Sequence, residues 1–280
     1  MKTCDLHAHS KYSDGTLSPE QLVTEAEWAG LSAIALCDHN TVSGLPEFVA
    51  AGERSLLETV PGIEFSTEYN DVELHLIMLF VKREHYAPIT SFLETYRRLK
   101  AESTRQLVAA LQKDGFRVDY DRLLSQVPDG GLNRAHIAAE LTRQGHTASI
   151  KEAFKKYLAP GRGYYSPPKR PDFFETVEFI KRLGGVAVLA HPFLNLDAAA
   201  LEQLLPKAAE LGLDAMETMY ARYDAATTET AKALARQFHL LESGGSDFHG
   251  DNKPDISLGI GTGDLQIPYS VLDELRTRTM

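Results

Sequence analysis

The sequence predicts an α/β protein whose sheet forms a barrel, and three features of its 280 residues support this fold class. Short apolar runs alternate with amphipathic stretches, a pattern typical of mainly parallel strands joined by right-handed helical crossovers. Histidines and carboxylates follow the ends of these runs, where α/β barrels carry their active sites. Between Val81 and Val186 the alternation stops and only helical patterns remain, which indicates a helical insert.

The first elements follow from local signals. Thr3–Ala8 is an expected strand. Residues 18–30 are an expected helix, because Ser18 can cap its start, Pro19 suits its first position and Gly30 follows its end. The next expected elements are strands at 32–39, 60–67 and 72–81 and a helix at 46–58.

The middle of the chain is expected to be helical. Tyr86–Lys113 has the pattern of one long helix, and shorter helices are expected at Asn133–Gln144 and Ser149–Leu158. The predicted domains are a barrel formed by residues 1–100 and 167–280 and an inserted helical cap formed by residues 101–166. After the insert, helices are expected at 173–184, 196–212 and 226–239, and strands at 185–192, 213–219 and 240–249.

Composition excludes several classes of protein. Cys4 and Cys37 are the two cysteines, so no disulfide framework is expected, and both are interpreted as core residues. No apolar run is long enough for a membrane span, and the N-terminus lacks an apolar leader, so a cytoplasmic location is expected. The net charge of −10 argues against duplex DNA as a partner, and no obligate protein partner is evident.

The charge is divided unevenly along the chain. Residues 82–170 contain 17 Lys and Arg against 9 Asp and Glu, whereas the remainder contains 12 against 30. An acidic barrel is therefore expected to carry a basic insert, which is suited to an anionic ligand.

The opening strand suggests metal ligands. On a strand, Asp5, His7 and His9 share one face, so two imidazoles can point at one ion. Taken alone, this pair fits a strand with partly exposed histidines equally well.

The other strand ends favour the metal site. A carboxylate within an apolar strand, such as Glu64, is costly unless it is paired or metal-bound. Six of the ten histidines gather with carboxylates at the same end of the expected sheet, and this is hard to explain by packing. The further candidates are Asp38, His39, Glu64, His75, His191, Asp247 and His249. Mixed imidazole and carboxylate ligation suits Mn, Fe or Zn. Asp38 points away from His39 and is interpreted as a supporting residue.

These motifs resemble those of a known family. DLHAHS, CDHN, PGIE, LHL, AHP and SDFH occur in the order of the polymerase and histidinol phosphatase (PHP) superfamily. The resemblance implies a distorted seven-stranded (β/α) barrel that binds up to three divalent ions, with Mn expected first and Fe or Zn as alternatives. The implied ligands are His7, His9, Asp14, His39, Glu64, His75, His191, Asp247 and His249. They would divide into His7, His9, Glu64 and Asp247 for one ion, Glu64, His75 and His191 for a second, and Asp14, His39 and His249 for a third.

Such a cluster predicts phosphoester hydrolysis. Two or three divalent ions can deprotonate a bridging water and stabilise the entering and leaving oxygens. Glu64 and Asp247 are the expected catalytic carboxylates, because they would hold the metal-bound hydroxide. GxxxxGK[ST], GxSxG and HExxH motifs are absent from the sequence.

The basic insert supplies candidates for substrate binding. Arg134 lies near a helix start, where the helix dipole favours an anion. Arg105, Arg162, Lys169 and Arg170 are further candidates, although each one singly is more often explained as solvated surface charge.

The opening DLHAHS, the NRAHIA helix and YLAPGRGYYSP resemble the stand-alone nucleotide phosphatases of the superfamily. That resemblance implies removal of the 3′-phosphate from nucleoside 3′,5′-bisphosphates such as adenosine 3′,5′-bisphosphate. It implies short RNA, degraded from the 5′ end, as a second substrate. The alternatives are a histidinol-phosphate phosphatase, which needs one phosphate only, and a non-catalytic module that binds metal and nucleotide.

Overall fold

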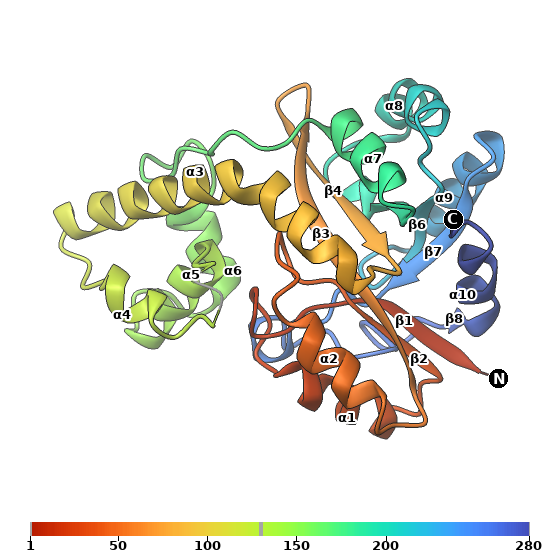
Figure 1. The fold of residues 1–280 in the computed structure, drawn as a ribbon. Coiled ribbons are helices and arrows are strands. Elements are labelled where there is room, and N and C mark those ends of the chain that lie inside the picture. The colour runs from red at the N-terminus through yellow and green to blue at the C-terminus, as the bar shows by residue number, and fades with distance from the viewer. Residues whose placement is uncertain (1, 129–130, 280) are drawn as a thin grey trace.

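The computed structural model describes residues 2–128 and 131–279. Eight strands form one sheet that curls into a nearly closed barrel with helices around it (Figure 1). The strand order is β7-β6-β5-β4-β3-β2-β1-β8. The strands are β1 (Thr3–Ala8), β2 (Ala33–Leu36), β3 (Glu58–Tyr69), β4 (Val72–Leu79), β5 (Val186–Ala190), β6 (Ala215–Tyr220), β7 (Leu241–Gly245) and β8 (Ile267–Pro268).

The α/β class is confirmed, but the expected count of seven strands is not. The additional strand, β8, is two residues long and pairs antiparallel with Thr3 and Cys4 at the start of β1. A strand this short has too little pattern to be found from sequence.

The sheet is also more mixed in direction than expected. β4 runs antiparallel to both β3 and β5, whereas β1, β2 and β3, and likewise β5, β6 and β7, run parallel. The cause is the two-residue turn at Asn70 and Asp71, whose φ angles of 48° and 63° are those of a tight hairpin. The hairpin brings His75 level with Ala190, the last residue of β5.

The barrel closes where β1 meets the end of β7. The N–H of Asp247 donates to the carbonyl of His7 at 2.8 Å, and the N–H of His9 donates to the carbonyl of Phe248 at 2.9 Å. Gly245 permits this approach, because a Cβ there would lie 2.1 Å from the Cβ of His7. Any larger residue would push the two strands apart.

Helices cover the outside of the sheet. They are α1 (Pro19–Trp28), α2 (Leu45–Gly52), α7 (Phe173–Arg182), α8 (Ala198–Glu210), α9 (Ala225–Gln237) and α10 (Tyr269–Arg276). Ser18 caps α1 as expected, in a capping box with Gln21. Cys4 and Cys37 are free and fully buried, in the same apolar cluster.

The central segment forms a helical lobe at the left of Figure 1. It comprises the second half of α3 (Tyr86–Lys113), α4 (Tyr120–Leu124), α5 (Arg134–Arg143), α6 (Ile150–Ala153) and a π-helical turn at Phe154–Leu158. Leu93 of α3 packs in the barrel core, whereas Leu107 and Leu111 pack in a separate cluster with the other lobe helices. Residue 101, the predicted start of the cap, lies between Leu93 and Leu107, and the division into two domains stays a prediction. Residues 129 and 130 of the predicted cap lie outside the described residues.

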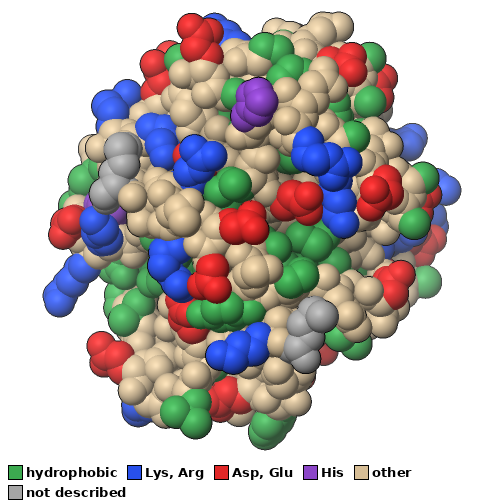
Figure 2. All heavy atoms as spheres, turned by 90° about the vertical axis from the view of Figure 1, so that its right-hand side faces the viewer, with side chains coloured by type: hydrophobic (Ala, Val, Ile, Leu, Met, Phe, Trp, Pro, Cys, Tyr) green, Lys and Arg blue, Asp and Glu red, His purple; other side chains and the backbone are tan. Residues whose placement is uncertain are grey.

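The barrel face turned away from the lobe carries interspersed acidic and basic side chains (Figure 2). A long polyanion would therefore meet charges of both signs on this face. Among the described residues, none of the helices combines the length and apolar character needed to cross a lipid bilayer.

Candidate metal centre

The structure brings the nine predicted ligands together at one end of the barrel. They come from the ends of β1, β2, β5 and β7 and from within β3 and β4. Seven are buried and two, His39 and His75, are half-buried. The nine are His7, His9, Asp14, His39, Glu64, His75, His191, Asp247 and His249.

Glu64 lies at the centre of this cluster. Its Oε2 is 2.9 Å from His39 Nδ1, 3.3 Å from His7 Nε2 and 3.4 Å from His9 Nε2. The backbone of β3 fixes the position, because the carbonyl of Glu64 accepts a hydrogen bond from the N–H of Asn40 at 2.9 Å.

The other oxygen of Glu64 faces the second half of the sheet. Oε1 lies 2.8 Å from His75 Nδ1 and 3.1 Å from His191 Nε2. One carboxylate therefore connects imidazoles from β1 and β2 with imidazoles from β4 and β5. This is the arrangement that a bridging ligand requires.

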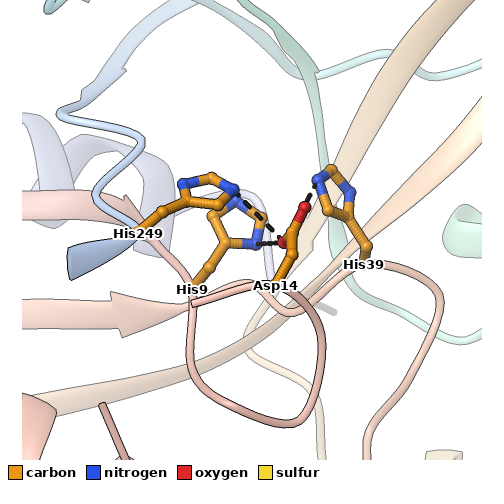
Figure 3. A group of neighbouring side chains, drawn as sticks. All are labelled: His9, Asp14, His39 and His249. Carbon is orange, nitrogen blue, oxygen red and sulfur yellow. Dashed lines mark ion pairs between the residues drawn. The ribbon is translucent and has the colours of Figure 1, made fainter. Parts of the chain in front are cut away.

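Asp14 is the centre of a second group, in which its carboxylate points between three imidazoles (Figure 3). Its Oδ1 is 3.2 Å from His249 Nε2, 3.8 Å from His39 Nε2 and 3.9 Å from His9 Nδ1.

The loop that carries Asp14 is held by Asp38. This carboxylate is 2% exposed and accepts hydrogen bonds from the N–H and hydroxyl of Ser10 and from the hydroxyl of Ser13. Burial raises the pKa of Asp38 to about 6, although its hydroxyl and amide donors oppose the shift. Asp38 thus supports the loop and does not join the ligand cluster, as the sequence predicted.

The two carboxylate oxygens of Asp247 have different partners: one is held by neighbouring side chains, and the other faces the histidines of the cluster. Oδ2 accepts from the hydroxyl of Tyr220 at 2.8 Å and from Lys253 Nζ at 2.6 Å. Oδ1 faces His9 Nε2 at 3.3 Å and His249 Nδ1 at 3.4 Å. The anchored carboxylate keeps one oxygen directed at the imidazoles.

The protonation states of Glu64, Asp14 and His9 suit metal ligation, whereas the neighbouring carboxylates raise the pKa values of His7 and His75. Burial alone would raise the pKa values of Glu64 and Asp14, but the neighbouring histidines hold both well below the ordinary range. Burial, together with the nearby His249, lowers the pKa of His9 well below its usual value. Ionised carboxylates and neutral imidazoles are the forms that bind metal ions.

Unsatisfied atoms show that the cluster fits cations. Within residues 2–128 and 131–279, five buried side-chain nitrogen or oxygen atoms lack a hydrogen-bond partner, and four of them lie here. They are His9 Nδ1, Asp14 Oδ1, His39 Nδ1 and Glu64 Oε2. A buried polar atom without a partner is costly, so divalent ions would supply what these atoms lack.

Three subsets of the cluster have ligand atoms within 4.8 Å of one another. They are His7, His9 and Glu64; His39, Glu64 and His75; and His9, Asp14, His39 and His249. The first subset lies within the group of ligands expected for one ion. The second subset adds His39 to Glu64 and His75, which are expected on another ion, and the third adds His9 to Asp14, His39 and His249. The division of ligands among ions stays a prediction.

A cavity adjoins the cluster on the side of the helical lobe. It encloses about 870 Å³, part of it open to solvent. Asp14, His39 and His75 are among the residues that line it. The basic residues that line it are Arg97, Lys100, Arg134, Lys169 and Arg170.

The predicted substrate-binding residues divide into two groups. Arg134, Lys169 and Arg170 line the cavity. Arg105 stacks on the ring of Tyr120 at 4.8 Å, and Arg162 is exposed in the loop before Tyr164. Neither Arg105 nor Arg162 lines the two cavities near the cluster, so the structure does not bring them to the ligands.

Sequence reasoning missed Arg97 and Lys100. Both lie on α3, on the face that Leu93 and Thr104 share at helical spacing. Two cations that interrupt a buried helical face are the signal that could have found them, because buried lysine and arginine need a partner.

Phosphate esters are hydrolysed most readily where divalent ions meet further positive charge, because the transition state is mainly a problem of stabilising anionic oxygens. The fold and the site therefore define a metal-dependent phosphoesterase, a hydrolase that acts on phosphoester bonds.

Comparison with known proteins identifies the family. A model of the PHP domain matches residues 5–164, more than half of the chain. The protein belongs to the PHP family.

Its relatives act on different substrates. The chain is 34% identical over 258 residues to the 5′-3′ exoribonuclease Rnm of Salmonella typhimurium, with 91% of this chain and 87% of the relative covered. It is 27% identical over 261 residues to the 3′,5′-nucleoside bisphosphate phosphatase of Chromobacterium violaceum, with 92% and 91% covered. A solved Bifidobacterium adolescentis protein, a candidate metal-dependent phosphoesterase, matches with a TM-score of 0.87 and 28% identity over 100% of this chain and 97% of the other.

Glu64 and His191 are expected to be essential for metal binding. After reconstitution with Mn²⁺ and desalting, the Glu64→Ala, His191→Ala double variant should retain almost no metal by elemental analysis, because both sides of the cluster lose a ligand. Glu58→Ala is the matched control, since Glu58 starts the same strand but pairs with Arg276. Wild-type metal content in the double variant would refute the assignment.

Proposed function

We propose that the protein removes the 3′-phosphate from nucleoside 3′,5′-bisphosphates such as adenosine 3′,5′-bisphosphate. One observation carries the proposal: a single cavity is lined both by candidate metal ligands and by basic side chains. A substrate with two phosphates can place one at the ligands and the other at the basic side chains.

Arg134 is the best-placed residue for the phosphate that is not cleaved. Its guanidinium stacks 4.2 Å from the ring centre of Tyr165, and Nη1 donates to the carbonyl of Leu158 at 3.3 Å. Glu73 Oε2 lies 3.8 Å from Nη2. These contacts orient the side chain while using only part of its five N–H donors.

The guanidinium, and not the helix start, would hold this phosphate. The side chain of Asn133 already accepts hydrogen bonds from the N–H groups of Ala135 and His136. These first amides of α5 therefore have a partner, which reduces what the helix terminus can offer an anion.

Lys100 would lie between the two phosphates of the bound substrate. It lies in the wall of the cavity and also borders a second cavity nearby. Burial lowers the pKa of Lys100, whereas Asp14 and Glu73 oppose that shift. A half-buried ammonium beside Asp14 is suited to neutralising a phosphoryl oxygen close to the ligand cluster.

The remaining roles follow from the cluster. Bound divalent ions, Mn²⁺ first among those that suit the ligands, would lower the pKa of a water molecule and neutralise charge on the phosphoryl group. Glu64 and Asp247 would act as the catalytic carboxylates, because as ionised ligands they would hold the ions that activate this water. Tyr220 and Lys253 keep Asp247 oriented through its outer oxygen.

Short RNA is a second candidate substrate. The second cavity shares His39, Lys100 and Asn133 with the first and extends past Tyr12 to Gly131. A chain that continues beyond the scissile phosphate would have space there. The exoribonuclease relative from Salmonella typhimurium gives this substrate further support.

Histidinol phosphate fits the cavity less well. It has a single phosphate, and its ammonium group would face a wall that contains Lys100 and Arg134. A non-catalytic module that binds metal and nucleotide would be expected to have lost some of the ligands, and all nine candidates are present.

A substrate panel tests the proposed function. With Mn²⁺, phosphate release should have the highest kcat/KM for adenosine 3′,5′-bisphosphate among this compound, 5′-AMP and histidinol phosphate. A 5′-phosphorylated RNA trimer should be shortened from its 5′ end. Preference for histidinol phosphate, or no difference between the bisphosphate and 5′-AMP, would overturn the proposal.

Arg134 gives a sharper prediction. A charge-assisted contact of this kind is worth about 1.5–3 kcal/mol, so Arg134→Ala should lower kcat/KM for the bisphosphate by roughly 10- to 150-fold. Hydrolysis of p-nitrophenyl phosphate, which has no second phosphate, should barely change. Arg162→Ala is the control, because Arg162 lies outside both cavities. Equal losses on both substrates would show that Arg134 supports the fold or the metal site instead.

A further inference from the structure

Glu217 is a fully buried carboxylate beside the cluster that is not among the predicted ligands. It lies in β6 and is 0% exposed. Its Oε1 is 2.9 Å from His7 Nδ1, and its Oε2 accepts a hydrogen bond from the backbone N–H of His191 at 2.7 Å. Each oxygen thus holds a different candidate ligand, on a different strand.

The contact with His7 determines which ring nitrogen is available. A carboxylate only accepts hydrogen bonds, so Nδ1 of His7 carries the proton. In the neutral imidazole, which is the form that binds a metal, Nε2 then has the lone pair, and it lies 3.3 Å from Glu64 Oε2 and 3.8 Å from Asp247 Oδ1. Glu217 therefore selects the tautomer of His7 that can bind a metal through Nε2.

The contact with His191 fixes a strained backbone. His191 has φ 29° and ψ 52°, near the left-handed region that non-glycine residues seldom adopt. The hydrogen bond to Glu217 holds its N–H in this conformation, and Nε2 of the ring then lies 3.1 Å from Glu64 Oε1. The rings of His7 and His191 stack at 5.5 Å with 15° between their planes.

We propose that Glu217 is a positioning residue that sets His7 and His191 on the two sides of Glu64, so that both imidazoles present Nε2 to the metal centre. The inference rests on the proposed ligand roles and not on the substrate. It extends to a carboxylate in β6, a strand that supplies none of the nine ligands.

Glu217→Gln tests this role with almost no change in shape. The amide oxygen can still accept from the N–H of His191, but the NH₂ group then faces His7 Nδ1. His7 must accept at Nδ1 and carry its proton on Nε2, where it blocks the metal. Mn²⁺ affinity, measured by competition with a chelator, should fall about 10- to 100-fold. The electronic spectrum of the Co²⁺-substituted protein should change as well.

The controls separate positioning from packing. Glu242→Gln changes a carboxylate on the neighbouring strand, where it accepts from Thr218, and should leave Mn²⁺ affinity unchanged. The melting temperature of the metal-free Glu217→Gln protein should stay close to wild type. Glu217→Asp keeps the acceptor but disturbs packing more, so it should melt lower than Glu217→Gln and bind Mn²⁺ more tightly.

The outcomes distinguish this inference from the proposed function. Wild-type Mn²⁺ affinity in Glu217→Gln, or Mn²⁺ binding that follows stability across both variants, would overturn the positioning role. Absence of Mn²⁺ binding by the wild-type protein would overturn the metal centre together with it. Because no readout uses a nucleotide, a wrong substrate assignment would leave the result unaffected.

Discussion

The burial of Glu64 is the constraint on which the rest of the site depends. A carboxylate that is 0% exposed in the middle of a sheet has a large desolvation cost. Imidazoles on both of its oxygens offset part of that cost, but Oε2 still lacks a hydrogen-bond partner of suitable geometry. Divalent ions held by the cluster would supply the further positive charge that this position needs. Other features of the barrel, including the close approach at Gly245 and the antiparallel β4, bring ligands to this one carboxylate.

Positive charge at the site would come from two sources: metal ions held by the barrel ligands, and basic side chains of the central segment. The barrel supplies anionic and neutral ligands that attract metal ions, while the segment from Lys82 to Arg170 supplies fixed cations. Lys100 and Arg134 face the cluster across one cavity. Arg134 pairs with Glu73 and not with a ligand carboxylate, and the cavity between these cations and the ligands can hold an anionic substrate.

Sequence patterns predicted those parts of the structure that depend on local chemistry. The limits of α3 and the cap of α1 agree with the structure because Ser18, Pro19 and helical periodicity act within a few residues. The nine candidate ligands were implied by the resemblance to the PHP superfamily, which the histidines and carboxylates near the ends of apolar strands supported. The direction of β4 was missed, since it depends on the positive φ angles of Asn70 and Asp71.

Residues whose roles depend on distant partners were harder to find. Glu217 is a carboxylate in an apolar strand, as Glu64 is, but its contacts lie 210 and 26 residues away in the sequence. Lys100 reads as an ordinary helical lysine until the lobe and the barrel are seen to enclose it. Arg105 and Arg162 were chosen by charge alone, and charge does not distinguish a cavity wall from a solvated surface.

Anomalous diffraction from crystals of the Mn²⁺-reconstituted protein would test the central claim most directly. The account predicts manganese peaks within roughly 2–2.5 Å of both oxygens of Glu64, with His7 Nε2 and His191 Nε2 on opposite sides. Peaks elsewhere, with Glu64 still hydrogen-bonded to His75 and His191 as it is here, would contradict it.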